Sequence, residues 1–362
     1  MRWITPALLF ILFTACARPV ATPAPPQAAA PPAAKQETPL VAQPRPAPLE
    51  QKLPDFVPDA ALPKTGSITS IGSDSMDPLM QLWLDDFRAS HPGITYNLVS
   101  KGSATAPKAM VAGTSLMGQM SREMNVAELA AFQDKFGYPP TRIVVAMDAL
   151  AVYVNANNPI AKLGLEQVDA IFSRDRKAGY GRALDTWGEL GLTLEWATRA
   201  IQPYGRDENS GTRAFFREHV LKQGEFKAIV KAVPDQFALV EAAAMDASAI
   251  AYGPVQHALR MVKAVPIVDF HAIDPILPAV ENILNGKYPL ARFLYIYVNV
   301  RPGQAADPMI KEFLRFVLSR QGQSDVANFG AIPLPADLAS INLAKFRSRS
   351  SAPGTGPPAH RR

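Results

Sequence analysis

The sequence predicts an α/β fold with a mainly parallel sheet. From about residue 67, short apolar runs typical of strands alternate with segments of helical periodicity, and this order repeats along the chain. The chain has 362 residues, 48% of them hydrophobic, so it can bury a large core, and its length suggests two domains or one large one. In such folds ligands bind beyond the carboxyl ends of the strands, in the loops that open the following helices. A site is therefore expected in those loops.

The first elements of this core follow from residue patterns. "SITSIGS" (67–73) predicts a strand, and the residues after it show one apolar face at helical spacing. The residues of that face are Leu79, Met80, Trp83, Leu84 and Phe87. Asp77 and Pro78 suit the N-cap and first position of this helix. "ITYNLVS" (94–100) then predicts the next strand.

The alternation continues along the chain. A short helix is expected from Ala104 to Ala112, closed by Gly113. "SLMGQMS" predicts a strand, and a helix is expected around "VAELAAFQDKF" (126–136). "TRIVVAM" and the apolar run "LAVYVN" predict two further strands.

A leader and a tether precede the core. "MRWITPALLFILFTAC" has one Arg and about a dozen mostly apolar residues, fewer than the roughly 20 that span a bilayer as a helix, so residues 1–15 are predicted to be a signal peptide. "FTAC" resembles a bacterial lipobox, which predicts lipidation of Cys16; an unmodified Cys in a cleaved peptide is the alternative. Since Cys16 is the only cysteine, an intramolecular disulfide is excluded. Residues 16–66 are rich in Pro and Ala and predict an extended spacer.

The positive charge of the chain lies in its ends. The formal net charge is +5, yet residues 67–340 contain 26 basic and 28 acidic residues and so carry −2. Residues 341–362 contain five Lys or Arg and no acid, and they predict a basic flexible tail. The core therefore has no broad positive field to attract polyanions, and no nucleic-acid partner is expected.

Three loops of the core share one chemistry. They are "GSDSMDP" (72–78), "KGSATAP" (101–107) and "GRDENSGTR" (205–213). Each places hydroxyls and small residues just before a helix, where the first turn leaves unpaired N–H groups and the positive end of the helix dipole. Together they predict an anion-binding site.

The third loop carries the most information. If Ser210 is the N-cap, Arg213 occupies the N3 position, so no capping box closes and N–H groups stay free. Gly211 lets a ligand approach the backbone, and Thr212 adds a hydroxyl. An ordinary capped helix is the alternative interpretation.

Arg206 precedes that cap. Its guanidinium offers a forked, permanently charged donor pair that suits a tetrahedral oxyanion. Glu208 could hold Arg206 in place by pairing with it. The alternative is a surface Arg with no ligand.

At these residues the sequence resembles the periplasmic phosphate-binding proteins of ABC transporters. "GSDSMDPLM" is similar to the first phosphate loop of that family, "GSATAPKAMVAGTSLMGQMSREM" to its second loop and the Ser-containing turn that follows, and "RDENSGTRAFF" to its R-x-[DE]-x-S-G-T signature. Further blocks, among them "DTWGELG" and "LNGKYPLARFLYIYVN", occur in the family's order. The resemblance covers roughly the whole core.

The resemblance implies a two-lobed periplasmic-binding-protein-like fold. Each lobe would be a mainly parallel sheet flanked by helices, and a double-crossing hinge would join the lobes near "DALAVYVN" and "AIAYGP". One lobe would comprise residues 67–147 and 255–340, and the other residues 148–254.

The resemblance also implies the phosphate contacts. They are Ser75, Met76 (through its backbone N–H), Ser103, Ser121, Arg206, Ser210, Gly211 and Thr212. Many members have an Asp at the position of Ser121, which accepts the proton of hydrogen phosphate and repels sulfate. Asp74 is the nearest other acceptor, and it could take this role or cap the first helix. Arg122 could face the cleft or be a surface charge.

The resemblance implies a binding protein that has no cofactor and catalyses no reaction. It would be a monomer in the periplasm or cell envelope, anchored through Cys16, that delivers inorganic phosphate to the permease subunits of an ABC transporter in the cytoplasmic membrane. The five dispersed His residues lack metal-ligand spacing, and no hydrolase or P-loop motif is present, so neither an enzyme nor a metal site is expected. The Met residues at 110, 117, 120 and 124 are interpreted as core filling. Another oxyanion, such as sulfate or molybdate, a structural or sensing role, and a phosphatase remain as alternatives.

Overall fold

The protein is described here from a computed structural model, which describes residues 49–50, 52–258 and 260–346. Cys16, the predicted signal peptide and most of the predicted tether and tail lie outside these residues. Within them, none of the helices has the length and apolar character that crossing a membrane requires.

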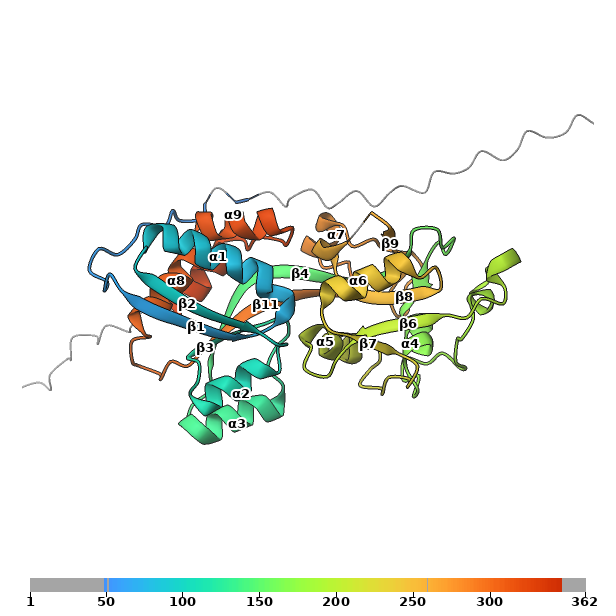
Figure 1. The fold of residues 1–362 in the computed structure, drawn as a ribbon, viewed down its shortest axis with the longest axis horizontal. Coiled ribbons are helices and arrows are strands. Elements are labelled where there is room, and N and C mark those ends of the chain that lie inside the picture. Colours follow the sequence, from blue (N-terminus) through green and yellow to red (C-terminus); the bar gives the residue numbers. More distant parts are fainter. Residues whose placement is uncertain (1–48, 51, 259, 347–362) are drawn as a thin grey trace, which may run out of the picture. The chain divides into compact units, whose positions relative to one another are not determined.

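The first part of the described chain forms a parallel sheet with helices on both faces. Its elements are β1 (Gly66–Gly72), η1 (Asp74–Met76), α1 (Asp77–Ser90), β2 (Ile94–Ser100), α2 (Thr105–Ala112), β3 (Met117–Met120) and α3 (Val126–Phe136). β1 pairs in parallel with both β2 and β3. Helices α1, α8 (Pro308–Val317) and α9 (Arg320–Phe329) cover one face and α2 and α3 the other (Figure 1).

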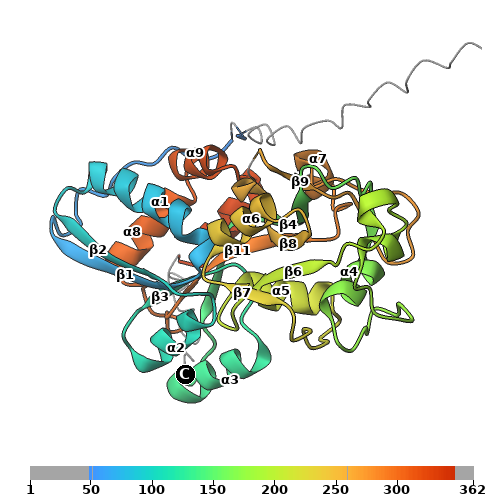
Figure 2. The same cartoon turned by 45° about the vertical axis from the view of Figure 1, so that its right-hand side comes forward.

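The second part repeats this plan. Its elements are β5 (Leu163–Gly164), α4 (Leu165–Phe172), η2 (Trp187–Leu190), η3 (Leu194–Trp196), β6 (Gln202–Arg206), α5 (Gly211–His219), β7 (Lys231–Val233), α6 (Gln236–Met245), β8 (Ala249–Pro254), η4 (Val255–His257), β9 (Val262–Ala264), β10 (Ile267–Val268) and α7 (Val280–Leu284). β6 pairs in parallel with β7 and β8. Figure 2 shows α6 on one side of these strands and α4 and α5 on the other.

Two long antiparallel strands join the two parts. They are β4 (Thr141–Asn155) and β11 (Ala291–Val298), and the sheet order in the described chain is β2-β1-β3-β11-β4-β8-β6-β7, with β9 on β4. "TRIVVAM" and "LAVYVN", predicted as separate strands, are one strand of 15 residues. Its first half pairs with β11 and its second half with β8, so β4 forms the first crossing.

The hydrophobic residues form two core clusters, which define the lobes used below. The first-lobe core takes residues between Leu53 and Ala146 and again between Leu294 and Phe346. The second-lobe core takes residues from Ala149 to Leu290, with Ile332 added. Residues 255–290, predicted to belong to the first lobe, therefore pack in the second, and the return crossing lies in β11 and not after "AIAYGP".

Local sequence signals account for most helix boundaries. The five predicted apolar residues of α1 are buried, and α3 begins at a capping box formed by Asn125 and Glu128. α2 ends at Gly113, whose φ of 73° is left-handed. Asp77 is the first residue of α1 and not its N-cap, because η1 precedes the helix directly.

Both ends of the described chain are more ordered than predicted. Leu53 is buried in the first-lobe core, and Phe56 packs edge-on against Phe316 of α8. The backbone N–H of Phe56 also donates to the Gln321 side chain at 2.8 Å. The spacer predicted to reach residue 66 is thus packed on the first lobe from about residue 49. Helix α10 (Ala336–Ala344) likewise extends into the predicted tail.

Candidate anion-binding site

Four serine hydroxyls meet beyond the carboxyl ends of β1, β2 and β3. Ser73 Oγ lies 3.0 Å from Ser75 Oγ and 3.1 Å from Ser121 Oγ. Ser121 Oγ is 3.2 Å from both Ser75 Oγ and Ser103 Oγ, and the Ser121 N–H donates to Ser103 Oγ at 3.0 Å. All four are buried. The structure thus brings together the three predicted serines of the first lobe and adds Ser73.

The start of helix α5 abuts this cluster from the second lobe. A Cβ added to Gly211 would lie 2.1 Å from Ser103 Oγ and 2.5 Å from Ser121 Oγ. Ser210 is the N-cap, as predicted, and its side chain accepts from the N–H of Arg213 at 3.3 Å. The first N–H groups of a helix have no acceptor within the helix. The backbone N–H groups of Gly211 and Thr212 are at this position in α5, beside the serines.

A second contact brings the same two loops together. The N–H of Ala104 donates to the carbonyl of Asn209 at 3.1 Å. Gly102, with φ +98°, leaves room for that carbonyl, because a Cβ there would lie 2.4 Å from it. The loop before α2 and the loop before α5 therefore pack backbone against backbone.

Arg206 is almost fully buried, with 2% of its side chain exposed. Its Nη1 pairs with Asp74 Oδ2 at 2.5 Å, and its Nε and Nη2 donate to the carbonyls of Val233 (3.2 Å) and Pro234 (2.9 Å). The prediction that Glu208 holds Arg206 is wrong: Glu208 is exposed and forms no ion pair with it in the described chain. The holding carboxylate comes from the other lobe.

Asp74 has one oxygen engaged and one free. Its Oδ2 binds Arg206, while its Oδ1 is buried without a hydrogen-bond partner among the described residues. No side chain caps η1 or α1, so the helix-capping role that the sequence left open is not seen. Met76 is fully buried where η1 meets α1. Its N–H was predicted as a ligand donor, and this remains a prediction.

Thr212 Oγ1 receives two hydrogen bonds. Gln236 Nε2 donates to it at 3.0 Å and Arg292 Nη1 at 3.3 Å. Arg292 also pairs with Asp148, with Nη2 and Nε at 2.7 Å and 3.1 Å from Asp148 Oδ2. Neither side chain of this pair is more than 2% exposed.

Four residues of this region were not predicted from the sequence: Ser73, Asp148, Gln236 and Arg292. A usable signal was present for two of them. Asp148 and Arg292 are single charges inside long apolar strand sequences, "IVVAMDALAVYVN" and "LARFLYIYV". Charges in such positions are expected to be buried with a partner of opposite sign. Gln236 carried no signal beyond its place at the start of a helix.

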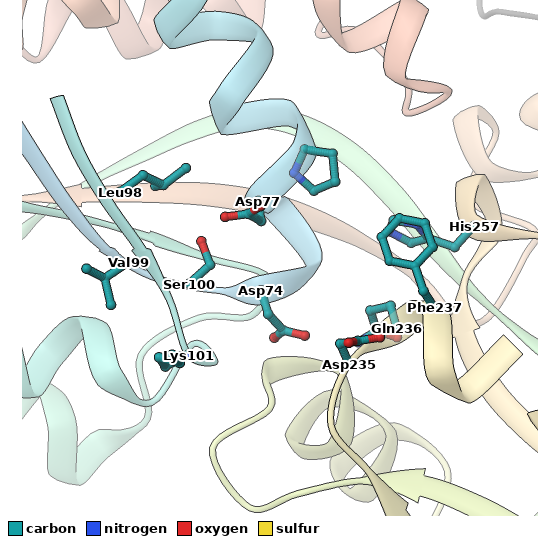
Figure 3. A pocket seen from close by; sticks show the side chains of 11 residues that line it. Asp74, Asp77, Leu98, Val99, Ser100, Lys101, Asp235, Gln236, Phe237 and His257 are labelled. Carbon is teal, nitrogen blue, oxygen red and sulfur yellow. The ribbon is translucent and has the colours of Figure 1, made fainter. Parts of the chain in front are cut away.

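A cavity of about 480 Å³ lies next to Asp74. Figure 3 shows Asp74, Asp77 and Asp235 around it, with Gln236, Phe237 and His257 on the second-lobe side. Burial lowers the pKa of His257, which favours a neutral imidazole near pH 7. The wall of this cavity therefore carries carboxylates and no excess of positive charge.

Two further sequence predictions concern residues near the loops. Arg122 does not face the serines: both its Nη atoms bind the Glu128 carboxylate at 2.7 Å. It is also mostly buried, so it is not a free surface charge either. The four Met residues at 110, 117, 120 and 124 pack in the first-lobe core, which confirms the interpretation as core filling. In the described ranges no group of His, Cys, Asp or Glu is arranged to hold a metal ion.

Known proteins share this chain's sequence and architecture. A family model described as a PBP superfamily domain matches residues 48–321. The chain is 40% identical over 288 residues to the phosphate-binding protein PstS of Pseudomonas aeruginosa, covering 78% of this chain and 89% of that protein. It is 25% identical over 288 residues to protein SphX of Synechococcus elongatus, covering 78% and 82%.

The fold is found among solved structures. An ABC-type phosphate transport receptor from Vibrio cholerae superposes with a TM-score of 0.58 at 21% identity, covering 74% of this chain and 100% of that one. At that identity the likeness concerns the fold alone. It confirms the predicted two-lobed α/β class.

Proposed function

The chain belongs to the PBP superfamily and, within it, to the family of the phosphate-binding protein PstS, and from this premise we propose that it binds inorganic phosphate between its two lobes. By its family it is a solute-binding protein and not an enzyme. The proposal rests on one observation: the buried hydroxyls of the first lobe lie against the start of α5, and Arg206 of the second lobe pairs with Asp74, which stands in the chain between Ser73 and Ser75 of the same cluster.

The chemistry of this set suits a small tetrahedral oxyanion. Hydroxyls and helix-start N–H groups are short, fixed donors, and they act strongly where water is excluded. Arg206 is already oriented by two carbonyls and Asp74, so little ordering of its side chain is required on binding. Such a site binds an anion without a positive surface field.

We propose that Asp74 reads the proton of hydrogen phosphate. Ser121 is neutral and cannot repel a fully ionised anion, whereas Asp74 Oδ1 is a buried acceptor with no partner among the described residues. A protonated phosphate oxygen can donate to this carboxylate. Sulfate has no proton to offer and would place a lone pair against it. Selectivity would thus come from Asp74 in place of an acid at position 121.

Isothermal calorimetry with phosphate and with sulfate tests both proposals. Arg206→Ala should abolish measurable phosphate binding, because the remaining donors are neutral. Asp74→Asn should weaken phosphate binding about 10-fold or more, which is the size expected for the loss of a charge-assisted hydrogen bond. It should also reduce the ratio of phosphate affinity to sulfate affinity. Arg217→Ala is the matched control, since Arg217 is on α5 but pairs with Glu225 at the far end of the helix.

The outcomes separate the candidate ligands. No heat with phosphate for the folded wild-type protein would contradict phosphate binding and favour a structural role. Tighter binding of sulfate or molybdate would favour another oxyanion. If the ratio of phosphate affinity to sulfate affinity is the same in Asp74→Asn as in the wild-type protein, Asp74 only holds Arg206 and does not select the ligand.

We also propose that the protein is an extracytoplasmic lipoprotein monomer that delivers its ligand to the permease of an ABC transporter. One protein of the same fold is an ABC-type phosphate transport receptor from Vibrio cholerae, which supports delivery to a transporter, and the leader and Cys16 support the anchor. Metabolic labelling with a palmitate analogue should mark the wild-type protein and not Cys16→Ser. Equal labelling of both would contradict lipidation at Cys16.

A further inference from the structure

A buried ion pair lies where the two crossing strands meet. Arg292 of β11 and Asp148 of β4 are direct partners in the antiparallel ladder. Their side chains join at 2.7 Å and are 2% and 0% exposed. Asp148 Oδ1 further accepts from the Ala149 N–H at 2.6 Å, so this carboxylate is fixed by backbone as well as by Arg292. The pair belongs to the strands that connect the lobes and not to any of the three anion loops.

The pair nevertheless reaches the anion site through one atom. Arg292 Nη1 donates to Thr212 Oγ1 at 3.3 Å, and Gln236 Nε2 donates to the same oxygen at 3.0 Å. A hydroxyl oxygen has two acceptor positions and one proton. With both acceptor positions filled, the Thr212 hydroxyl can only donate, and its neighbours Ser210 and Gly211 belong to the proposed phosphate site.

Charge gives the pair a second effect. Arg292 places a positive charge within one hydrogen bond of Thr212, while Asp148 neutralises it. Since both charges are buried, water screens them little. The field that an anion at Thr212 experiences therefore depends on the balance between Arg292 and Asp148.

We propose that Arg292 and Asp148 are positioning residues of the anion site: Arg292 sets the Thr212 hydroxyl as a donor to the ligand, and Asp148 limits the positive field that Arg292 adds. The proposal rests on phosphate as the ligand of this site. Under this proposal, removing Arg292 weakens phosphate binding and removing the charge of Asp148 strengthens it. If the ion pair only held the two strands together, both substitutions would weaken binding.

Phosphate titrations of single variants test the sign. Arg292→Gln should weaken phosphate binding about 10-fold or more, the scale of a lost charge-assisted contact. Asp148→Asn keeps an acceptor for Arg292 and removes the negative charge, so it should tighten phosphate binding by about 3-fold or more. If the pair served only to hold the strands together, both substitutions would weaken phosphate binding. Arg315→Gln is the control, because Arg315 pairs with Glu312 on α8, away from the site.

A double-mutant cycle tests the route through Thr212. In a Thr212→Val background, which removes the hydroxyl at nearly constant shape, Arg292→Gln should weaken binding clearly less than it does in the wild-type background, and the loss that remains is the charge effect of Arg292. An equal loss in both backgrounds would overturn the assigned route. If Arg292→Gln does not fold, Arg292→Lys keeps the charge but lacks the second amino group that reaches Thr212, and it should weaken binding about 3-fold or more.

The results remain separable from those of the proposed function. Failure of wild-type protein to bind phosphate contradicts the function itself. Phosphate binding by wild type, with Arg292→Gln and Arg292→Lys unchanged, or with Asp148→Asn weakened like Arg292→Gln, overturns the inference and leaves the function intact. Circular dichroism of each variant verifies that it is folded.

Discussion

Two buried Arg–Asp pairs have the same chemistry and different supports. Asp74 and Arg206 come from loops of different lobes, and one Asp74 oxygen has no partner among the described residues. Asp148 and Arg292 face each other across a strand ladder, and both Asp148 oxygens are bonded. The first pair can separate if the loops part, whereas the second cannot separate without breaking the sheet. The difference teaches that the support, and not the ion pair itself, decides whether a pair can respond to a ligand.

The comparison predicts unequal losses of stability, and this is the largest effect expected. Asp148→Ala leaves the buried Arg292 guanidinium without its counter-charge and should lower the free energy of unfolding by about 3 to 5 kcal/mol. Asp74→Ala should lower it by about 1 kcal/mol or less, because Arg206 keeps its carbonyl acceptors and can become hydrated when the loops part. Urea unfolding in phosphate-free buffer measures both. Equal losses would remove the distinction drawn between the pairs.

The meeting of the loops can be broken without touching any charge. Gly211→Ala places a methyl group 2.1 Å from Ser103 Oγ and 2.5 Å from Ser121 Oγ, so the start of α5 must move away from the serines. Phosphate affinity should fall about 100-fold, in line with the sensitivity of such sites to displacements near 1 Å. Gly181→Ala is the matched control, since its added Cβ would meet open space. Retained affinity in Gly211→Ala would mean that the hydroxyls and α5 do not share one ligand.

Asp325 and Asp86 form a pair of like charges, in contrast to the two Arg–Asp pairs, and the smallest change in stability is expected there. Burial, with the nearby Asp86 carboxylate, raises the pKa of Asp325 in α9 to about 7. The folded protein therefore binds this proton more tightly than the unfolded chain does, and stability is lost as pH rises from about 4 through 7. Asp325→Asn should raise the free energy of unfolding by about 1 to 2 kcal/mol at pH 8 and change it little at pH 4.

Thermal unfolding at the two pH values checks this prediction. Asp134→Asn, an exposed Asp of α3, is the control and should show no such pH dependence. A gain of equal size at pH 4 and pH 8 would show that the carboxylate of Asp325 is not the cause.

Local patterns predicted much of the site. Hydroxyl-rich loops before helices indicated Ser75 and Ser103 at strand ends, the family resemblance added Ser121, and Ser210 caps α5 as its residue type favours. These features depend on neighbours within a few residues, which a single sequence displays. The apolar face of α1 and the end of α2 at Gly113 were predictable for the same reason.

Features that depend on distant partners were not predictable in this way. Glu208 is only two residues from Arg206, yet Asp74, 132 residues away, holds the guanidinium. Residues 255–290 pack in the second lobe because β9 pairs with the end of β4, and no local signal specifies that pairing. The segment around Leu53 and Phe56 looked like spacer because its apolar residues are few, although these two side chains pack in the first-lobe core.

The sequence alone thus determined the alternation of strands and helices, the donors at helix starts and the near-neutral charge of the core. These properties are written in residue types and short spacings. Only the tertiary structure decided which carboxylate meets which guanidinium, where the chain crosses between lobes, and that Thr212 is held by Arg292 and Gln236. Such pairings arise because packing brings together residues that are 24, 80 and 132 positions apart in the chain, and burial then forces each charge and each hydroxyl to find a partner.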